Sequence, residues 1–246
     1  MIVGSPRTGT ELLTRLLDQH PDCLARGELF NQVHDYRGLV CGRRYEDGED
    51  GASFLERFYS LHPSMPAVGF KLHYAQARES PAARRVWTSL VSDHTIRVVF
   101  TLRDNLLAQL VSLEQAQLSH DWSLKVGRAP SFPEPVCIAP EDAAEFFRNQ
   151  VAVEQELEQI FANHKHLTVE YERIARNPHD EVNRVFSFLG LTPTLVYPPL
   201  AKQAVATPST ALANFNELSL FFRCSEYARF FVITGGTHVS LRGSMT

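Results

Sequence analysis

The sequence predicts an α/β fold of three layers, in which helices flank both faces of a central, mostly parallel sheet. Short apolar runs alternate along the chain with stretches of helical period, and this order is typical of strands joined by crossover helices. The length of 246 residues fits one folded domain, and 44% hydrophobic with 21% charged residues is an ordinary composition for one. We therefore expect a single domain over residues 1–246, whose polar end, residues 235–246, is a disordered tail.

The expected elements follow in order from the N-terminus. Residues 1–4 form a first strand, and the helix after it carries an apolar stripe that ends before Pro21. A second strand follows this helix. Later strands are expected at residues 67–72, 95–102 and 166–170, and later helices at residues 81–92, 104–119, 141–164 and 178–190. Between two of these helices, the proline-rich residues 120–140 form a long loop that we interpret as a lid.

Charge and composition exclude several classes of protein. A net charge of −4 is far from the basic balance of a general nucleic-acid binder. No run approaches the roughly 18 apolar residues of a membrane span, and no signal peptide is recognisable, so we expect a cytoplasmic protein without an integral membrane segment. The four cysteines lie far apart without zinc spacing, and we expect reduced thiols and no metal site.

An anion-binding loop is predicted where the first strand meets the first helix. Gly4 and Gly9 have the spacing of the phosphate-binding pattern G-x-x-x-x-G-K-[ST], but Thr10 and Glu11 occupy its Lys and Ser/Thr positions. The usual Mg²⁺ ligand is therefore missing, which argues against a nucleotide triphosphatase. The backbone N–H groups of residues 8–11 could still bind an anion at the helix N-terminus, and Arg7 supplies a positive charge inside the loop.

The stretch Pro6-Arg7-Thr8-Gly9-Thr10 resembles the 5′-phosphosulfate loop of sulfotransferases that use 3′-phosphoadenosine 5′-phosphosulfate (PAPS). A second motif strengthens the resemblance. Arg103 ends an expected strand and Ser112 follows nine residues later, and an Arg and a Ser at such a spacing hold the 3′-phosphate in that family. This contact distinguishes PAPS from ATP.

Two further stretches extend the resemblance. Lys202-Gln203 is similar to the C-terminal segment that covers the cofactor in sulfotransferases, and Gly27-Glu28-Leu29-Phe30 is similar to an element of bacterial carbohydrate sulfotransferases of the trehalose type. The resemblance implies a P-loop-like fold, PAPS as cofactor, adenosine 3′,5′-bisphosphate as product and no required metal. It assigns cofactor binding to Pro6, Arg7, Thr8, Gly9, Thr10, Glu11, Arg103, Ser112, Lys202 and Gln203.

The same resemblance implies three catalytic residues, Glu28, His73 and Lys71. An acceptor hydroxyl needs a base that removes its proton in the transition state, and two of these residues compete for that role. Glu28 matches the glutamate base of the trehalose-type enzymes, whereas His73, two residues after Lys71, matches the histidine base of the cytosolic sulfotransferases. In a strand, Lys71 and His73 point to the same face, and Lys71 could stabilise the leaving phosphate. The sequence leaves the choice of base open.

We expect in-line transfer of a sulfuryl group from PAPS to a hydroxyl of a carbohydrate, a glycolipid or a small metabolite. Two alternatives stay open: a P-loop kinase of small molecules, which Thr10 and Glu11 disfavour, and a non-catalytic nucleotide-binding protein of the same fold. A homodimer is also left open. Candidates to border the acceptor cavity are His34, Gln76 and Trp122.

Overall fold

The computed structural model describes residues 1–28, 51–78, 81–120, 122, 134–198 and 207–232 of the chain. Within them the chain forms two compact units, and each is described by itself. Unit 1 comprises Met1–Leu102 and Glu156–Pro199, and unit 2 comprises Arg103–Gln155 and Leu200–Thr246. The expected tail at 235–246 and most of the expected lid, residues 123–133, lie outside the described residues. The single domain stays a prediction.

Unit 1 contains a five-stranded sheet in which every neighbouring pair of strands is parallel. Its strands are β1 (Ile2–Gly4), β2 (Cys23–Glu28), β3 (Ala67–His73), β4 (Val98–Leu102) and β5 (His166–Glu170). Their order across the sheet is β2-β3-β1-β4-β5, so the first strand lies at the centre. This arrangement confirms the predicted parallel sheet.

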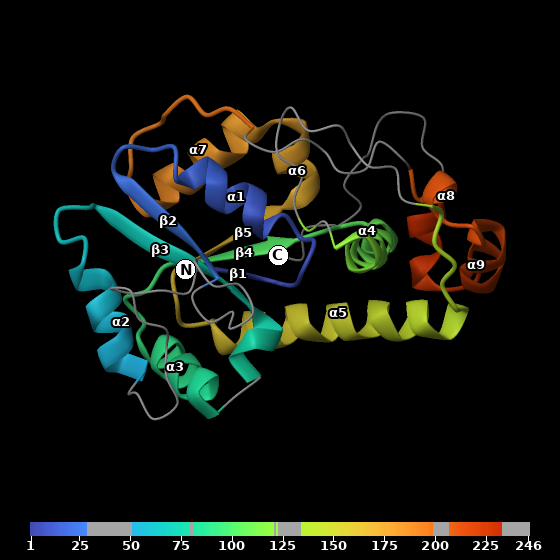
Figure 1. Ribbon diagram of the computed structural model, residues 1–246, viewed down its shortest axis with the longest axis horizontal. Coiled ribbons are helices and arrows are strands. Elements are labelled where there is room, and N and C mark those ends of the chain that lie inside the picture. The colour runs from blue at the N-terminus through green and yellow to red at the C-terminus, as the bar shows by residue number, and fades with distance from the viewer. Residues whose placement is uncertain (29–50, 79–80, 121, 123–133, 199–206, 233–246) are drawn as a thin grey trace. The chain divides into compact units, whose positions relative to one another are not determined.

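Helices cover both faces of this sheet (Figure 1). One face carries α1 (Thr10–Leu17), α6 (Tyr171–Arg176) and α7 (Pro178–Leu189), and the other carries α2 (Gly51–Ser60) and α3 (Pro81–Ser92). Apolar side chains of α1, α6 and α7 pack with those of the strands into one buried cluster, which includes Leu13, Leu16, Val99, Ile174 and Phe186. The predicted three-layer α/β fold is therefore confirmed.

The side chains of β3 alternate between the two faces of the sheet. The ring of Phe70 is buried and lies 5.6 Å from the ring of Phe58 in α2. Lys71, the next residue, points to the opposite face, where its ammonium group reaches Glu11 of α1. His73 shares this face with Lys71, as the strand period predicts.

A bulge in β2 decides where Glu28 points. Along the pairing of β2 with β3, Arg26 lies opposite Phe70, but the register then shifts so that Glu28 lies opposite Lys71. Without the extra residue, Glu28 would lie opposite Leu72 and its side chain would be on the other face. The bulge at Gly27 therefore brings Glu28 to the face that holds Lys71 and His73.

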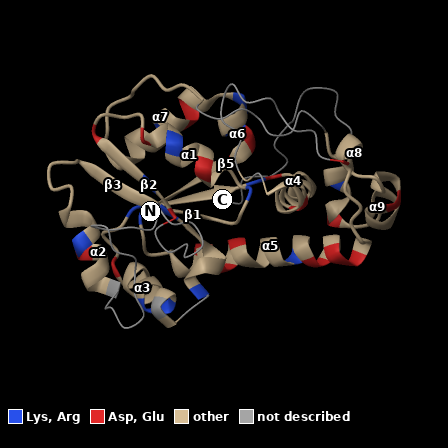
Figure 2. Ribbon diagram, viewed as in Figure 1, with Lys and Arg blue, Asp and Glu red and all other residues tan. Residues whose placement is uncertain are grey.

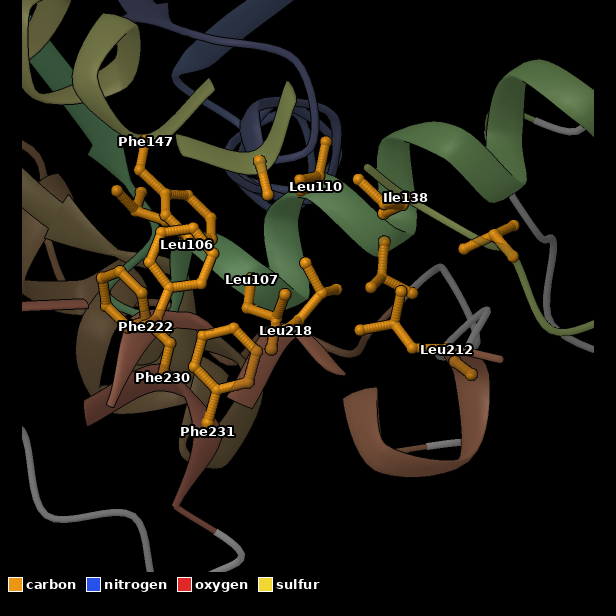
Figure 3. Packing of buried hydrophobic residues seen from close by; sticks show 14 residues of the cluster. Leu106, Leu107, Leu110, Ile138, Phe147, Leu212, Leu218, Phe222, Phe230 and Phe231 are labelled. Atoms are coloured by element: carbon orange, nitrogen blue, oxygen red, sulfur yellow. The ribbon is translucent and has the colours of Figure 1, made fainter. Parts of the chain in front are cut away.

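Unit 2 is helical around an apolar core. Its elements are α4 (Leu106–Ser119), most of α5 (Pro140–Ile160), α8 (Pro208–Ala211), α9 (Phe215–Phe222) and the 3₁₀ helix Glu226–Phe231. In the core, the ring of Phe147 lies 5.3 Å from the rings of both Phe222 and Phe230 (Figure 3). Acidic side chains recur along α5, in keeping with its amphipathic pattern (Figure 2). Across the described residues, no helix combines the length and apolarity needed to cross a membrane.

Before residue 190, two helices were not predicted, and one strand is shorter than expected. α2 and the six-residue α6 are additions to the predicted elements, and α6 is too short for a helical period to be recognised. β4 begins at Val98 rather than at Thr95, because the side chain of Asp93 accepts hydrogen bonds from the backbone N and Oγ1 of Thr95 at 3.0 and 2.6 Å. That contact holds residues 93–95 in a turn.

Gly4→Ala should destabilise unit 1, because a Cβ atom at this position would lie 2.2 Å from Thr101 Oγ1 and 2.8 Å from Thr8 Oγ1. We expect the free energy of unfolding, measured in urea, to fall by about 1–3 kcal/mol. Gly69→Ala is the matched control, since among the described residues its Cβ would meet just the Met1 nitrogen, at 3.9 Å. Equal stability of the two variants would contradict the tight packing of Gly4.

Candidate active site

The loop between β1 and α1 turns back on itself with two residues in the left-handed region. The φ angle is +67° at Arg7 and +88° at Gly9. Such a conformation is strained for a residue other than glycine, and strain of this kind is concentrated at functional sites. Thr8 holds the turn, since its Oγ1 donates to the carbonyl of Ser5 at 2.8 Å and lies 2.9 Å from Thr101 Oγ1. The loop is thereby fixed to the end of β4.

The start of α1 has the properties of an anion site. The N-cap residue is Gly9, which has no side chain to accept a hydrogen bond from the first N–H groups of the helix. A Cβ atom on Gly9 would lie 2.9 Å from the ring of Tyr171, and only glycine fits between that ring and the loop. The loop is therefore tightly packed at the N-terminus of α1, where backbone N–H groups can bind an anion.

A buried lysine connects the loop to β2. Nζ of Lys71 lies 2.7 Å from Oε2 of Glu11 and 2.9 Å from Oε1 of Glu28. The side chain of Lys71 is 5% exposed, and those of Glu11 and Glu28 are 19% and 17% exposed. A cation so deeply buried needs anionic partners, and Lys71 has two of them.

His73 and Gln76 complete the surroundings of Glu28. His73 Nε2 lies 3.3 Å from Oε1 of Glu28, and its Nδ1 lies 3.2 Å from the carbonyl oxygen of Gly4. The side-chain amide of Gln76 donates to Oε2 of Glu28 at 2.7 Å, and its oxygen accepts from the backbone N–H of His73 at 3.3 Å. The two candidates for the base are therefore in direct contact with each other.

The surroundings of Glu28 keep it ionised. Burial alone would raise the pKa of this carboxyl, but the hydrogen bond from His73 and the positive charge of Lys71 outweigh burial and hold the pKa well below its usual range. Glu28 is consequently a carboxylate at neutral pH. While both partners remain in place it is a weak proton acceptor.

The structure brings Glu28, Lys71 and His73 together beside the loop, with Glu11 as a fourth member. Other predicted site residues are not tested in this way. Arg103 directly follows β4 and Ser112 lies within α4, and both belong to unit 2. Lys202 and Gln203 lie outside the described residues, as does His34.

Sequence reasoning missed Arg15 and did not foresee the contact that Gln76 makes in this network. Arg15 donates from Nε to Oε1 of Glu11 at 2.7 Å, and its i,i+4 spacing on the helix was a signal that could have been read. Gln76, which the sequence placed among the candidates to border the acceptor cavity, donates a hydrogen bond to Glu28. That contact depends on the bulge in β2, for which the sequence holds no clear signal.

A parallel sheet whose central strand leads through a tight loop into α1 defines an α/β protein of the P-loop-like class. A family model of the sulfotransferase domain matches residues 1–221. Nodulation protein H of Rhizobium meliloti (strain 1021) is 30% identical over 243 residues, which cover 94% of this chain and 93% of that protein. Nodulation protein H of Rhizobium tropici is 29% identical over 238 residues, covering 94% and 92%.

The chain therefore belongs to the sulfotransferase family, and the prediction of a sulfotransferase is confirmed. A crystal structure of a sulfotransferase from Alicyclobacillus acidocaldarius is similar with a TM-score of 0.51. It is 16% identical and the match covers 90% of each chain, a likeness that supports the fold alone.

Glu28→Gln should make the free energy of unfolding less dependent on pH in the acid range. Because the pKa of Glu28 is lower in the folded than in the unfolded chain, its stabilising effect is complete above about pH 4.3 and is lost as the pH falls below that value. We expect urea unfolding to show a steeper loss for the wild type than for Glu28→Gln between about pH 4.5 and 3. Glu158→Gln, at an exposed position in α5, should keep the wild-type slope. Parallel curves for wild type and Glu28→Gln would contradict the ionic network.

Proposed function

We propose that this protein transfers the sulfuryl group of PAPS to a hydroxyl group of a carbohydrate. The observation that carries the proposal is that the Lys71 ammonium contacts both Glu28 and Glu11, the latter in the first turn of α1. A cation for the leaving phosphate and a carboxylate for the acceptor proton thus lie side by side.

The donor substrate fits the residues of the loop. Its 5′-phosphosulfate would be held by the N–H groups at the start of α1, with positive charge from Arg7 and Lys71. Gly4 and Gly9 let the loop pack closely, because a Cβ at Gly4 would clash with Thr101 and a Cβ at Gly9 would clash with the ring of Tyr171. The assignment of Arg103 and Ser112 to the 3′-phosphate stays a prediction from the sequence, as does that of Lys202 and Gln203 to the segment over the cofactor.

The hydrogen bonds of His73 favour Glu28 as the base. A carbonyl oxygen only accepts, so Nδ1 of His73 donates to Gly4. Nε2 faces the carboxylate of Glu28, which also accepts. Both ring nitrogens of His73 thus face oxygen atoms of the protein, an arrangement that suits a residue that orients Glu28. His73 then orients Glu28, and Glu28 takes the proton.

The proposed reaction is a direct displacement at the sulfur atom of PAPS. The acceptor oxygen forms a bond to sulfur while the bond between sulfur and the phosphate oxygen breaks, and the acceptor proton passes to Glu28. The negative charge that develops on the leaving phosphate is stabilised by Lys71 and Arg7. Products are the sulfated acceptor and adenosine 3′,5′-bisphosphate.

A carbohydrate acceptor is proposed from the sequence motif around Glu28. The stretch from Gly27 to Phe30 is the one that resembles bacterial carbohydrate sulfotransferases, and Glu28 is its one carboxylate. A panel of mono- and oligosaccharides, glycolipids and small hydroxylated metabolites, each incubated with labelled PAPS, tests this class. Transfer to the metabolites alone would overturn the carbohydrate assignment while leaving the sulfotransferase activity in place.

Glu28→Gln should reduce turnover by about 10²- to 10⁴-fold, because the amide keeps the shape but cannot accept a proton. The affinity for adenosine 3′,5′-bisphosphate, measured by calorimetry, should barely change. His73→Asn should reduce turnover less. Near wild-type turnover of Glu28→Gln, together with a larger loss in His73→Asn, would make His73 the base.

Arg103→Ala should narrow the preference for 3′-phosphorylated nucleotides. A hydrogen bond to a charged group contributes about 1.5–3 kcal/mol, and the affinity ratio of adenosine 3′,5′-bisphosphate to adenosine 5′-phosphate should shrink accordingly. Arg148→Ala, at an exposed position in α5, is the control and should leave the ratio unchanged. The titrations are run with EDTA present, since no metal is assigned to this site. An unchanged ratio in Arg103→Ala would remove Arg103 from the 3′-phosphate site.

A further inference from the structure

Glu11 carries a carboxylate at a position where one is unexpected. It lies in the first turn of α1, where negative charge suits the helix dipole but would repel an anion bound at the same N-terminus. The structure gives each of its oxygens a cation. Oε1 accepts from Arg15 Nε at 2.7 Å and Oε2 accepts from Lys71 Nζ at 2.7 Å. The charge of Glu11 is thus neutralised within the protein.

Lys71 is the partner that Glu11 and Glu28 have in common. An ammonium group has three donors on a flexible stem and no fixed fork geometry, so it can shift between neighbouring acceptors. The contacts to Glu11 and Glu28 use two of these donors. An anion bound at the start of α1 competes with Glu28 for these donors.

The position of Lys71 controls how good a base Glu28 is. The positive charge of Lys71 is one reason that the pKa of Glu28 lies below its usual range. A proton can be accepted readily only when this charge moves away from Glu28. When the Lys71 ammonium leaves Glu28, Glu11 is the second carboxylate with which this buried charge can stay paired.

We propose that Glu11 is a positioning residue of the transfer reaction, holding Lys71 at the start of α1 so that Glu28 is released when an anion binds there. This inference rests on the function proposed above. Without the charge of Glu11, Lys71 has Glu28 as its remaining carboxylate partner among the described residues, and the ammonium stays on the base.

Two substitutions of Glu11 test the role. Glu11→Gln removes the charge and keeps the size, and Glu11→Ser restores the hydroxyl of the common phosphate-loop pattern. Both should lower kcat by about tenfold or more, for transfer to a sugar and for the slow hydrolysis of PAPS by water. The affinity for adenosine 3′,5′-bisphosphate should stay the same or tighten, because a nearby negative charge is lost.

Matched variants separate this role from a structural one. Glu141→Gln removes an exposed carboxylate from the first turn of α5 and should change neither kcat nor affinity. Arg15→Gln removes the other cation from Glu11 and leaves Lys71 more firmly on it. It should lower kcat less than Glu11→Gln does, while weakening the affinity for adenosine 3′,5′-bisphosphate. A structural role would instead lower kcat and the melting temperature together in both variants.

The proposal is overturned if both Glu11 variants keep kcat within about twofold of the wild type. It is also overturned if their affinity for adenosine 3′,5′-bisphosphate weakens in step with kcat, which would make Glu11 a ligand of the donor or a structural residue. A wild-type protein that does not bind adenosine 3′,5′-bisphosphate at all would overturn the proposed function, and the role of Glu11 with it. If the wild type binds adenosine 3′,5′-bisphosphate but the Glu11 variants have the same kcat as the wild type, only the role of Glu11 is overturned.

Discussion

The ammonium group of Lys71 lies buried between the carboxylates of Glu11 and Glu28, and the arrangement of the site follows from that contact. A charge removed from water must be paired at close range, so the three side chains have to come from elements that the fold holds together firmly. β3 supplies the lysine, α1 supplies one carboxylate and β2 supplies the other. The parallel sheet places these elements around one edge, where ligands of open α/β sheets bind.

Two local departures from regular structure adapt this sheet to the site. The bulge between Arg26 and Glu28 turns Glu28 toward Lys71, at the cost of one residue without a regular partner. The left-handed backbone at Arg7 and Gly9 reverses the chain after β1 and leads it into α1. Both are locally unfavourable, and the well-packed layers on either side of the sheet hold them in place.

Periodicity predicted most of the fold. The helix at 81–92 and the strand at 166–170 agree with α3 and β5 to the residue, because each has a clear pattern and a defined end. The residue types of the site were also predictable, since Glu28, Lys71 and His73 stand in recognisable motifs. Their contacts were not. A one-residue bulge changes the face of the sheet on which Glu28 lies, and no pattern in the sequence predicts this bulge. The proposal of Glu28 rather than His73 as the base rests on the contacts of the His73 ring nitrogens, which the sequence does not supply.

A crystal structure of the protein with adenosine 3′,5′-bisphosphate tests the central claim most directly, because it reports where the Lys71 ammonium goes when the anion site is filled. We expect Nζ of Lys71 to donate to an oxygen of the 5′-phosphate, to keep its contact with Glu11 and to move beyond hydrogen-bond distance of Glu28. A complex in which Lys71 stays on Glu28 and leaves Glu11, or in which the 5′-phosphate binds away from the start of α1, would contradict it.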